Sequence, residues 1–126
     1  MSLAKPSSPR FQALFFKDLF DRFQELHADA LQALEGLPQE ALDWKPGPGM
    51  NSLAVLVVHL TGAERYLLQE LVLGEPLGRI REEEFKAHGL NGNDLVQLLR
   101  TADESDRQAL RHMTLTTLKG MRTSPR

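Results

Sequence analysis

The feature that most constrains the fold is a segment, residues 53–60, that is apolar at nearly every position. It follows a Pro-Gly-Pro-Gly stretch, which can continue neither a helix nor a central strand. A helix that starts after this stretch can be capped by Asn51 or Ser52 and ended by Gly74. Because a helix that is apolar on all sides is buried among neighbours, the sequence predicts a central helix over residues 53–73 with partners on several sides.

Two further segments have the periodicity of amphipathic helices. Residues 11–34 place their apolar side chains on one arc, at about 100° per residue, and their charges on the other side. Gly36 is a stop signal for this helix. A third helix, with a leucine-rich stripe, is predicted to start at Asn91 or Asn93 and to end near Met113.

Three long helices without a convincing strand pattern predict an all-α fold of the helix-bundle type. The connection between the second and third helices is long, and its charged part, residues 79–85, predicts one or two helical turns. Residues 1–10 contain two Pro and three Ser and predict a flexible arm. A single domain is therefore expected over residues 11–126, with residues 114–126 as a loop.

Three helices leave the central helix partly uncovered, and the sequence stops where a fourth helix is expected. Either the domain is truncated at its C-terminus or a second chain closes the bundle. We therefore expect a homo-oligomer, a dimer in the simplest case. We also expect Leu56→Asp to unfold the protein, because a charge on the central helix would be buried without a partner.

Composition excludes several classes of function. The 126 residues include 15 basic and 17 acidic side chains, so the formal net charge of -2 disfavours a nucleic-acid partner. The absence of cysteine excludes thiol nucleophiles and thiolate zinc sites, and it fits a reducing compartment. No apolar run approaches the roughly 20 residues that span a bilayer. We expect a cytoplasmic protein without a membrane partner.

Two residues of the central helix are candidates for a functional site. His59 interrupts the apolar run, and imidazole is a common metal ligand, although a histidine satisfied by a carbonyl group or water is the favoured interpretation. Glu64 falls in the middle of the apolar arc. It fits a pocket acid behind a metal-bound histidine, or equally a buried ion pair with Arg65 or Arg79.

Other polar or aromatic residues receive structural interpretations. Asp106 also faces the apolar arc of its helix, where we favour a salt bridge that fixes helix register. His27 lies among phenylalanines and is expected to pack against them, His88 to be exposed, and His112 to complement a helix C-terminus. Trp44 is expected to close one end of the bundle.

Two motifs resemble a known family. The sequences WKPGPGMNSL (residues 44–53) and HLTGAERY (residues 59–66) resemble the DinB/YfiT-like superfamily and, more narrowly, its DUF664-type branch. The resemblance covers residues 11–122 and implies an up-down-down-up four-helix bundle, often a homodimer. It also implies a divalent metal, usually nickel or zinc, held by a helix-2 histidine that His59 matches and by a His-x-x-x-His on helix 4. Characterised relatives include transferases and isomerases that use low-molecular-weight thiols.

The chain departs from this pattern, because it contains no His-x-x-x-His and only three of the four helices. One histidine cannot hold a catalytic metal, which needs about three protein ligands. We therefore expect an incomplete metal site, and weak nickel or zinc binding at best.

Two hypotheses of function follow. The first is a divalent-metal enzyme, a thiol-dependent transferase or a hydrolase, that takes a small-molecule thiol. In this hypothesis His59 is a metal ligand, Glu64 lies behind it, and the catalytic residues are unassigned. Such an enzyme is expected to be inactive if the chain ends at residue 126. The second is a non-catalytic helical module that self-associates through an open apolar groove.

Overall fold

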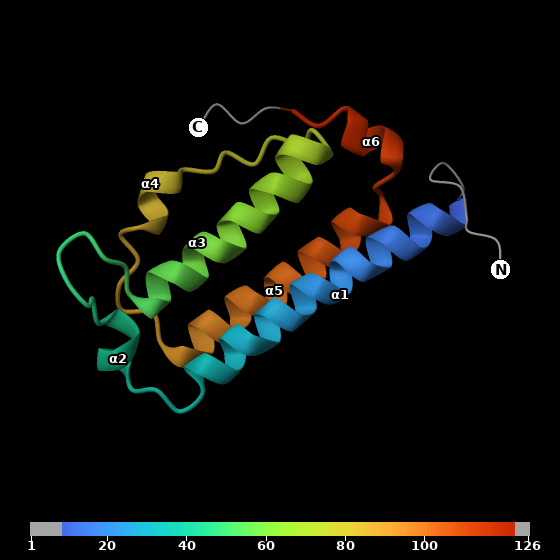
Figure 1. The fold of residues 1–126 in the computed structure, drawn as a ribbon. Coiled ribbons are helices and arrows are strands. Elements are labelled where there is room, and N and C mark those ends of the chain that lie inside the picture. Colours follow the sequence, from blue (N-terminus) through green and yellow to red (C-terminus); the bar gives the residue numbers. More distant parts are fainter. Residues whose placement is uncertain (1–8, 123–126) are drawn as a thin grey trace.

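The computed structural model describes residues 9–122, which form helices and no strand (Figure 1). The predicted arm over residues 1–10 lies outside the described residues, except that its last two residues begin the first helix. The elements in chain order are α1 (Pro9–Leu34), α2 (Gln39–Asp43), α3 (Leu53–Arg65), the π-helix η1 (Tyr66–Val72), α4 (Arg81–Glu84), α5 (Gly92–Arg111) and α6 (Leu115–Lys119). The predicted all-α class and its three long helices are confirmed.

The three long helices run in an up-down-down order. Helix α1 is antiparallel to α3 and α5, which both run the other way (Figure 1). The segment between η1 and α5 makes this order possible, because it returns the chain along the bundle and includes the short helix α4. Helix α5 packs against both α1 and α3 and so lies at the centre of the arrangement.

The helix ends follow from local chemistry. The Ser52 hydroxyl accepts a hydrogen bond of 3.1 Å from the Val55 amide, so Ser52 rather than Asn51 caps α3. Asn91 caps α5 through a reciprocal pair of bonds with Asp94. Helix α1 is followed by Gly36 at φ +73°, a left-handed conformation that favours glycine.

The predicted helix from residue 53 to about residue 73 is present over that length, but only its first part is an α-helix. From Tyr66 the chain continues as the seven-residue η1, whose wider turns the sequence did not predict. Such turns are uncommon and are found mostly near functional sites. This one begins two residues after Glu64.

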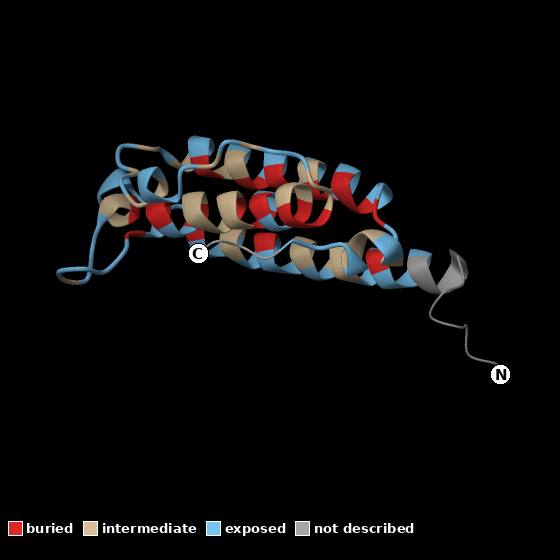
Figure 2. Ribbon diagram, turned by 90° about the horizontal axis from the view of Figure 1, so that it is seen from above, coloured by how far each residue is buried: buried red, intermediate tan, exposed pale blue. Residues whose placement is uncertain are grey.

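The expectation that three helices leave α3 partly uncovered is confirmed, but the expectation that Leu56 is buried is wrong. Leu56 is 48% exposed, and Leu53 and Leu67 are also exposed. The reason is that α5, α2 and α4 pack against only part of the α3 surface. These leucines therefore stay in contact with solvent. Figure 2 shows buried residues alternating with exposed residues along the helices, so each helix is buried on one side only.

Two further expectations are corrected. Trp44 is 65% exposed and does not close the bundle end. Residues 114–126 contain the short helix α6, because Thr114 and Thr117 form a capping box at its start. Within the part of the chain that the structure describes, no helix has the length and apolarity required to cross a membrane.

The core consists of two apolar clusters. One contains side chains from α1, η1 and α5 and from the turn between α5 and α6: Phe16, Leu68, Val72, Ala109, Leu110 and Met113. The other lies nearer to α2 and contains Leu34, Leu42, Ala54, Val57, Leu95 and Leu99. Between the two clusters lie a buried histidine of α1 and one buried acid each of α3 and α5: His27, Glu64 and Asp106.

Candidate metal centre

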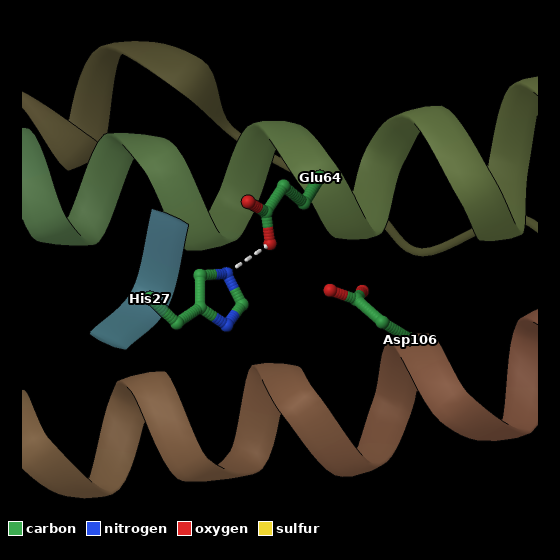
Figure 3. A group of neighbouring side chains, drawn as sticks. All are labelled: His27, Glu64 and Asp106. Atoms are coloured by element: carbon green, nitrogen blue, oxygen red, sulfur yellow. Dashed lines mark hydrogen bonds and ion pairs between the residues drawn. The ribbon is translucent and has the colours of Figure 1, made fainter. Parts of the chain in front are cut away.

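His27 is the centre of a buried polar cluster between the three long helices (Figure 3). It lies on the inward face of α1 and is 1% exposed. Its Nε2 atom is 2.7 Å from Oε2 of Glu64 on α3, and its Nδ1 atom is 2.5 Å from Oδ1 of Asp103 on α5. Both ring nitrogens are thus held by carboxylates, which fixes the orientation of the imidazole.

Asp106 completes the cluster from α5, one helical turn after Asp103. Its side chain points toward the space between His27 and Glu64 (Figure 3) and is 1% exposed. One ligand atom from each of His27, Glu64 and Asp106 lies within 4.8 Å of the other two. Oε1 of Glu64 and Oδ2 of Asp106 are buried and have no hydrogen-bond partner among the described residues.

The cluster changes the pKa values of its members. Burial lowers the pKa of His27, but hydrogen bonds to Glu64 and Asp103 outweigh that effect and raise it to about 9. Burial raises the pKa of Asp106 to about 8, and the negative charge of Glu64 adds to this increase. At neutral pH, His27 of the metal-free cluster is therefore protonated, whereas a histidine in water is mostly neutral at this pH. Asp106 is protonated as well.

These protonation states define what the cluster can bind. Release of one proton from Nε2 of His27 and one from Asp106 leaves an imidazole nitrogen and two carboxylates facing a common point. A divalent cation that replaces the two protons leaves the buried charge unchanged. It also supplies a partner for the two unpartnered oxygens. The residues present therefore fit a divalent metal with mixed nitrogen and oxygen ligands, such as zinc, manganese, iron or nickel.

Comparison with known proteins places the chain in a family. Residues 22–126, which include all four residues of the cluster, match the sequence profile of the DinB superfamily. The chain belongs to the DinB superfamily. No curated protein and no solved structure matches it.

In this DinB-superfamily chain, His59 lies apart from the buried cluster. Its Nδ1 atom is 3.0 Å from Oε1 of Glu84 on α4, and its ring packs against Phe85 with centroids 5.0 Å apart. Arg79 forms two hydrogen bonds with the same Glu84 carboxylate, at 2.8 and 2.7 Å. Gly62 allows this approach, because a Cβ atom there would overlap the Glu84 carboxylate.

The role of His59 as a metal ligand stays a prediction. The groups next to its ring are one carboxylate and one guanidinium, and the guanidinium opposes a second cation. The interpretation of His59 as a histidine with a polar partner describes its contacts better, although that partner is Glu84 rather than a carbonyl group or water. These contacts tie the crossover segment to α3.

The sequence predicts Glu64 as either a pocket acid or a buried ion-pair partner of Arg65 or Arg79. The structure places it in the buried cluster, where its partner is His27 and it is a potential direct ligand. His27 and Asp106 were given other interpretations, and both are corrected. His27 contacts carboxylates rather than aromatic rings because its side chain points to the interior between α1, α3 and α5. Asp106 has no cationic side chain other than His27 near it, so it forms no register-fixing salt bridge with a lysine or arginine among the described residues.

One signal in the sequence could have identified this cluster. Glu64 and Asp106 lie in the middle of the apolar arcs of their helices, and His27 lies at the edge of its arc; all three fall between the two apolar clusters of the core. Three such residues at similar heights can meet if the helices pack side by side. The other three histidines, His59, His88 and His112, lie outside the cluster, whereas Asp103 joins it through its bond to His27.

Proposed function

We propose that this protein is a metal-dependent enzyme of the DinB superfamily whose divalent ion is held by His27, Glu64 and Asp106. One observation carries the proposal: three buried ionisable side chains from three helices converge within 4.8 Å, and two of their oxygens have no partner. Isolated buried acids cost several kcal/mol of stability, so an arrangement of this kind requires a compensating ligand or proton.

The ion would supply Lewis-acid chemistry, lowering the pKa of a bound water or thiol at neutral pH. Asp103 accepts the Nδ1–H of His27 and so directs Nε2 toward the other two ligands. Asp103 is 29% exposed, so one edge of the cluster reaches solvent, where a small substrate can approach.

The substrate class follows from the family resemblance together with the composition. The 126 residues contain no cysteine, so a thiol that takes part in the reaction must come from a small molecule. We therefore propose a transferase or hydrolase reaction with a low-molecular-weight thiol. Assignment to the DUF664-type branch rests on the motifs at residues 44–53 and 59–66.

Metal titration tests the site directly. The protein is stripped with a chelator and titrated calorimetrically with Zn²⁺, Ni²⁺ and Mn²⁺, with the expectation of about one ion per chain. His27→Gln and Asp106→Asn are each expected to weaken binding at least about a hundredfold, because each removes one of three ligands.

Two control variants separate this site from the alternatives. Glu104→Gln changes an exposed acid on the same helix as Asp106, and it is expected to leave binding unchanged. His59→Ala tests the position that the family resemblance implies. Loss of binding in His59→Ala, together with unchanged binding in His27→Gln, would reject the proposed site and support His59.

A second candidate function is a non-catalytic module that self-associates through an apolar surface. The observation that favours it is the exposure of apolar side chains on α3, η1 and α1: Leu53, Leu56, Leu67, Phe15 and Leu26. Light scattering of the protein and of Leu56→Gln tests this candidate. A dimer that dissociates on this substitution supports it, and a monomer at all concentrations rejects it.

A further inference from the structure

A groove with a calculated volume of about 620 Å³ lies between α1 and α5, at the end of the bundle farthest from α2 (Figure 1). Its apolar wall consists of Phe16, Phe20, Leu110 and Met113, which continue into one of the two core clusters. This volume is typical of small-molecule sites, which span about 300–1,000 Å³. The groove shares no lining residue with the candidate metal centre, so it is a separate feature.

The charged side chains that line the groove all have the same sign. They are Lys17 on α1 and Arg107 and Arg111 on α5, and no acidic residue lines the groove. The chain as a whole has a formal charge of -2, so three cations around one apolar groove are a local reversal of the overall charge. Asp21 and Glu104, which lie outside the lining, offset part of this charge, and the remaining positive field at the groove favours an anion.

The three cations differ in how far they are engaged by other groups. Lys17 is paired with Asp21 at 2.8 Å. Nε of Arg107 lies 3.9 Å from Oε2 of Glu104, and its guanidinium lies over the Phe20 ring, 4.9 Å from the centroid, which holds it beside the apolar wall. Arg111 is exposed and forms no ion pair with any residue that the structure describes, so its charge is available to a ligand.

We propose that this groove, which is large enough to hold it, binds a free medium-chain carboxylate of about eight to twelve carbons. The alkyl chain lies against Phe16, Phe20 and Met113, and the carboxylate pairs with Arg111 and Arg107 at the rim. Two parallel N–H···O bonds match the planar guanidinium to a carboxylate. A concave groove encloses one chain, whereas binding to a membrane surface requires apolar side chains that protrude.

Calorimetric titration with sodium decanoate tests the proposal on the full chain. Octanoate and dodecanoate are expected to show an affinity change of about three- to fourfold per methylene, as expected for burial of the chain. Decanol and decylamine have the same chain without the negative charge, and they are expected to bind at least about tenfold more weakly.

Variants locate the site. Arg111→Gln is expected to weaken decanoate binding about tenfold, because it removes the guanidinium that pairs with the decanoate carboxylate. Ala13→Trp fills the groove from α1 and is expected to abolish binding. Leu26→Ala, an exposed apolar residue elsewhere on α1, is the matched control and is expected to leave binding unchanged. If Ala13→Trp fails to fold by circular dichroism, Arg111→Gln decides the location.

Several results would overturn the proposal. These are the absence of decanoate binding below millimolar concentrations, equal affinity for decanol and decanoate, and an unchanged affinity in Arg111→Gln. Sedimentation of the protein with phosphatidylglycerol vesicles without binding of free decanoate would also overturn it, and would assign the basic rim to a membrane surface instead. None of these measurements requires the metal centre to be active.

Discussion

Replacement of Asp106 by asparagine is expected to stabilise the metal-free protein while it destroys the metal site. The carboxyl of Asp106 is buried, and its pKa is raised from 3.8 to about 8. At pH 7 the folded protein must hold a proton that the unfolded chain has released. At about 1.4 kcal/mol per pH unit, the interval between 3.8 and 7 corresponds to a cost of about 4 kcal/mol.

Asparagine removes this cost because it does not ionise, but its buried amide needs partners that the cluster only partly provides. That deficit is worth about 1–3 kcal/mol. The expected net gain at pH 7 is therefore about 1–3 kcal/mol, or an increase of about 3–10 °C in melting temperature for a chain of this size. Glu104→Gln, on the exposed face of the same helix, is expected to change stability by less than about 0.5 kcal/mol.

The pH dependence of this gain identifies its cause. A raised pKa means that the contribution of Asp106 to stability is present in full below pH 3.8 and is lost as the pH rises through about 8. The stability difference between Asp106→Asn and the unsubstituted protein should therefore grow from pH 4 to pH 8 and then level off. Urea unfolding of both proteins across this range measures it. A difference that is constant with pH, or a destabilised variant at pH 8, would refute the reasoning.

Three further predictions concern other parts of the structure. Because His27 and Asp106 have pKa values of about 9 and 8, metal binding at pH 7 should release about two protons; calorimetry in buffers of different ionisation enthalpy measures this number, and zero release would contradict the proposed ligands. Glu84→Gln should lower the free energy of unfolding by about 1–2 kcal/mol at pH 7. Burial raises the pKa of Glu84, but hydrogen bonds from Arg79 outweigh burial and lower it. A lowered pKa stabilises the folded state above about pH 4.5, and this stabilisation is lost as the pH falls. The stability difference between Glu84→Gln and the unsubstituted protein should therefore vanish at acid pH. A difference that persists there would contradict the ion pair. Leu56→Asp should stay folded by circular dichroism because Leu56 is 48% exposed, whereas Leu99→Asp should unfold because Leu99 is fully buried, and the reverse order would contradict the packing.

The sequence by itself determined the local structure. The 3.6-residue periodicity and the capping residues placed the three long helices within a few residues of their bounds in the structure, because both act over one or two turns of chain. The same reasoning identified Ser52 and Asn91 as possible caps. It did not predict the π-helical turns of η1, since no residue type in that segment specifies them.

Only the tertiary structure decided which side chains meet. His27, Glu64 and Asp106 are separated by 37 and 42 residues and share a site because three helices place them at the same height between two apolar clusters. His59 was the more conspicuous histidine in the sequence, yet the crossover brings Glu84 and Arg79 to it. Helix positions depend on neighbours in the chain, whereas helix register depends on packing between distant segments, and a single sequence records only the first of these directly.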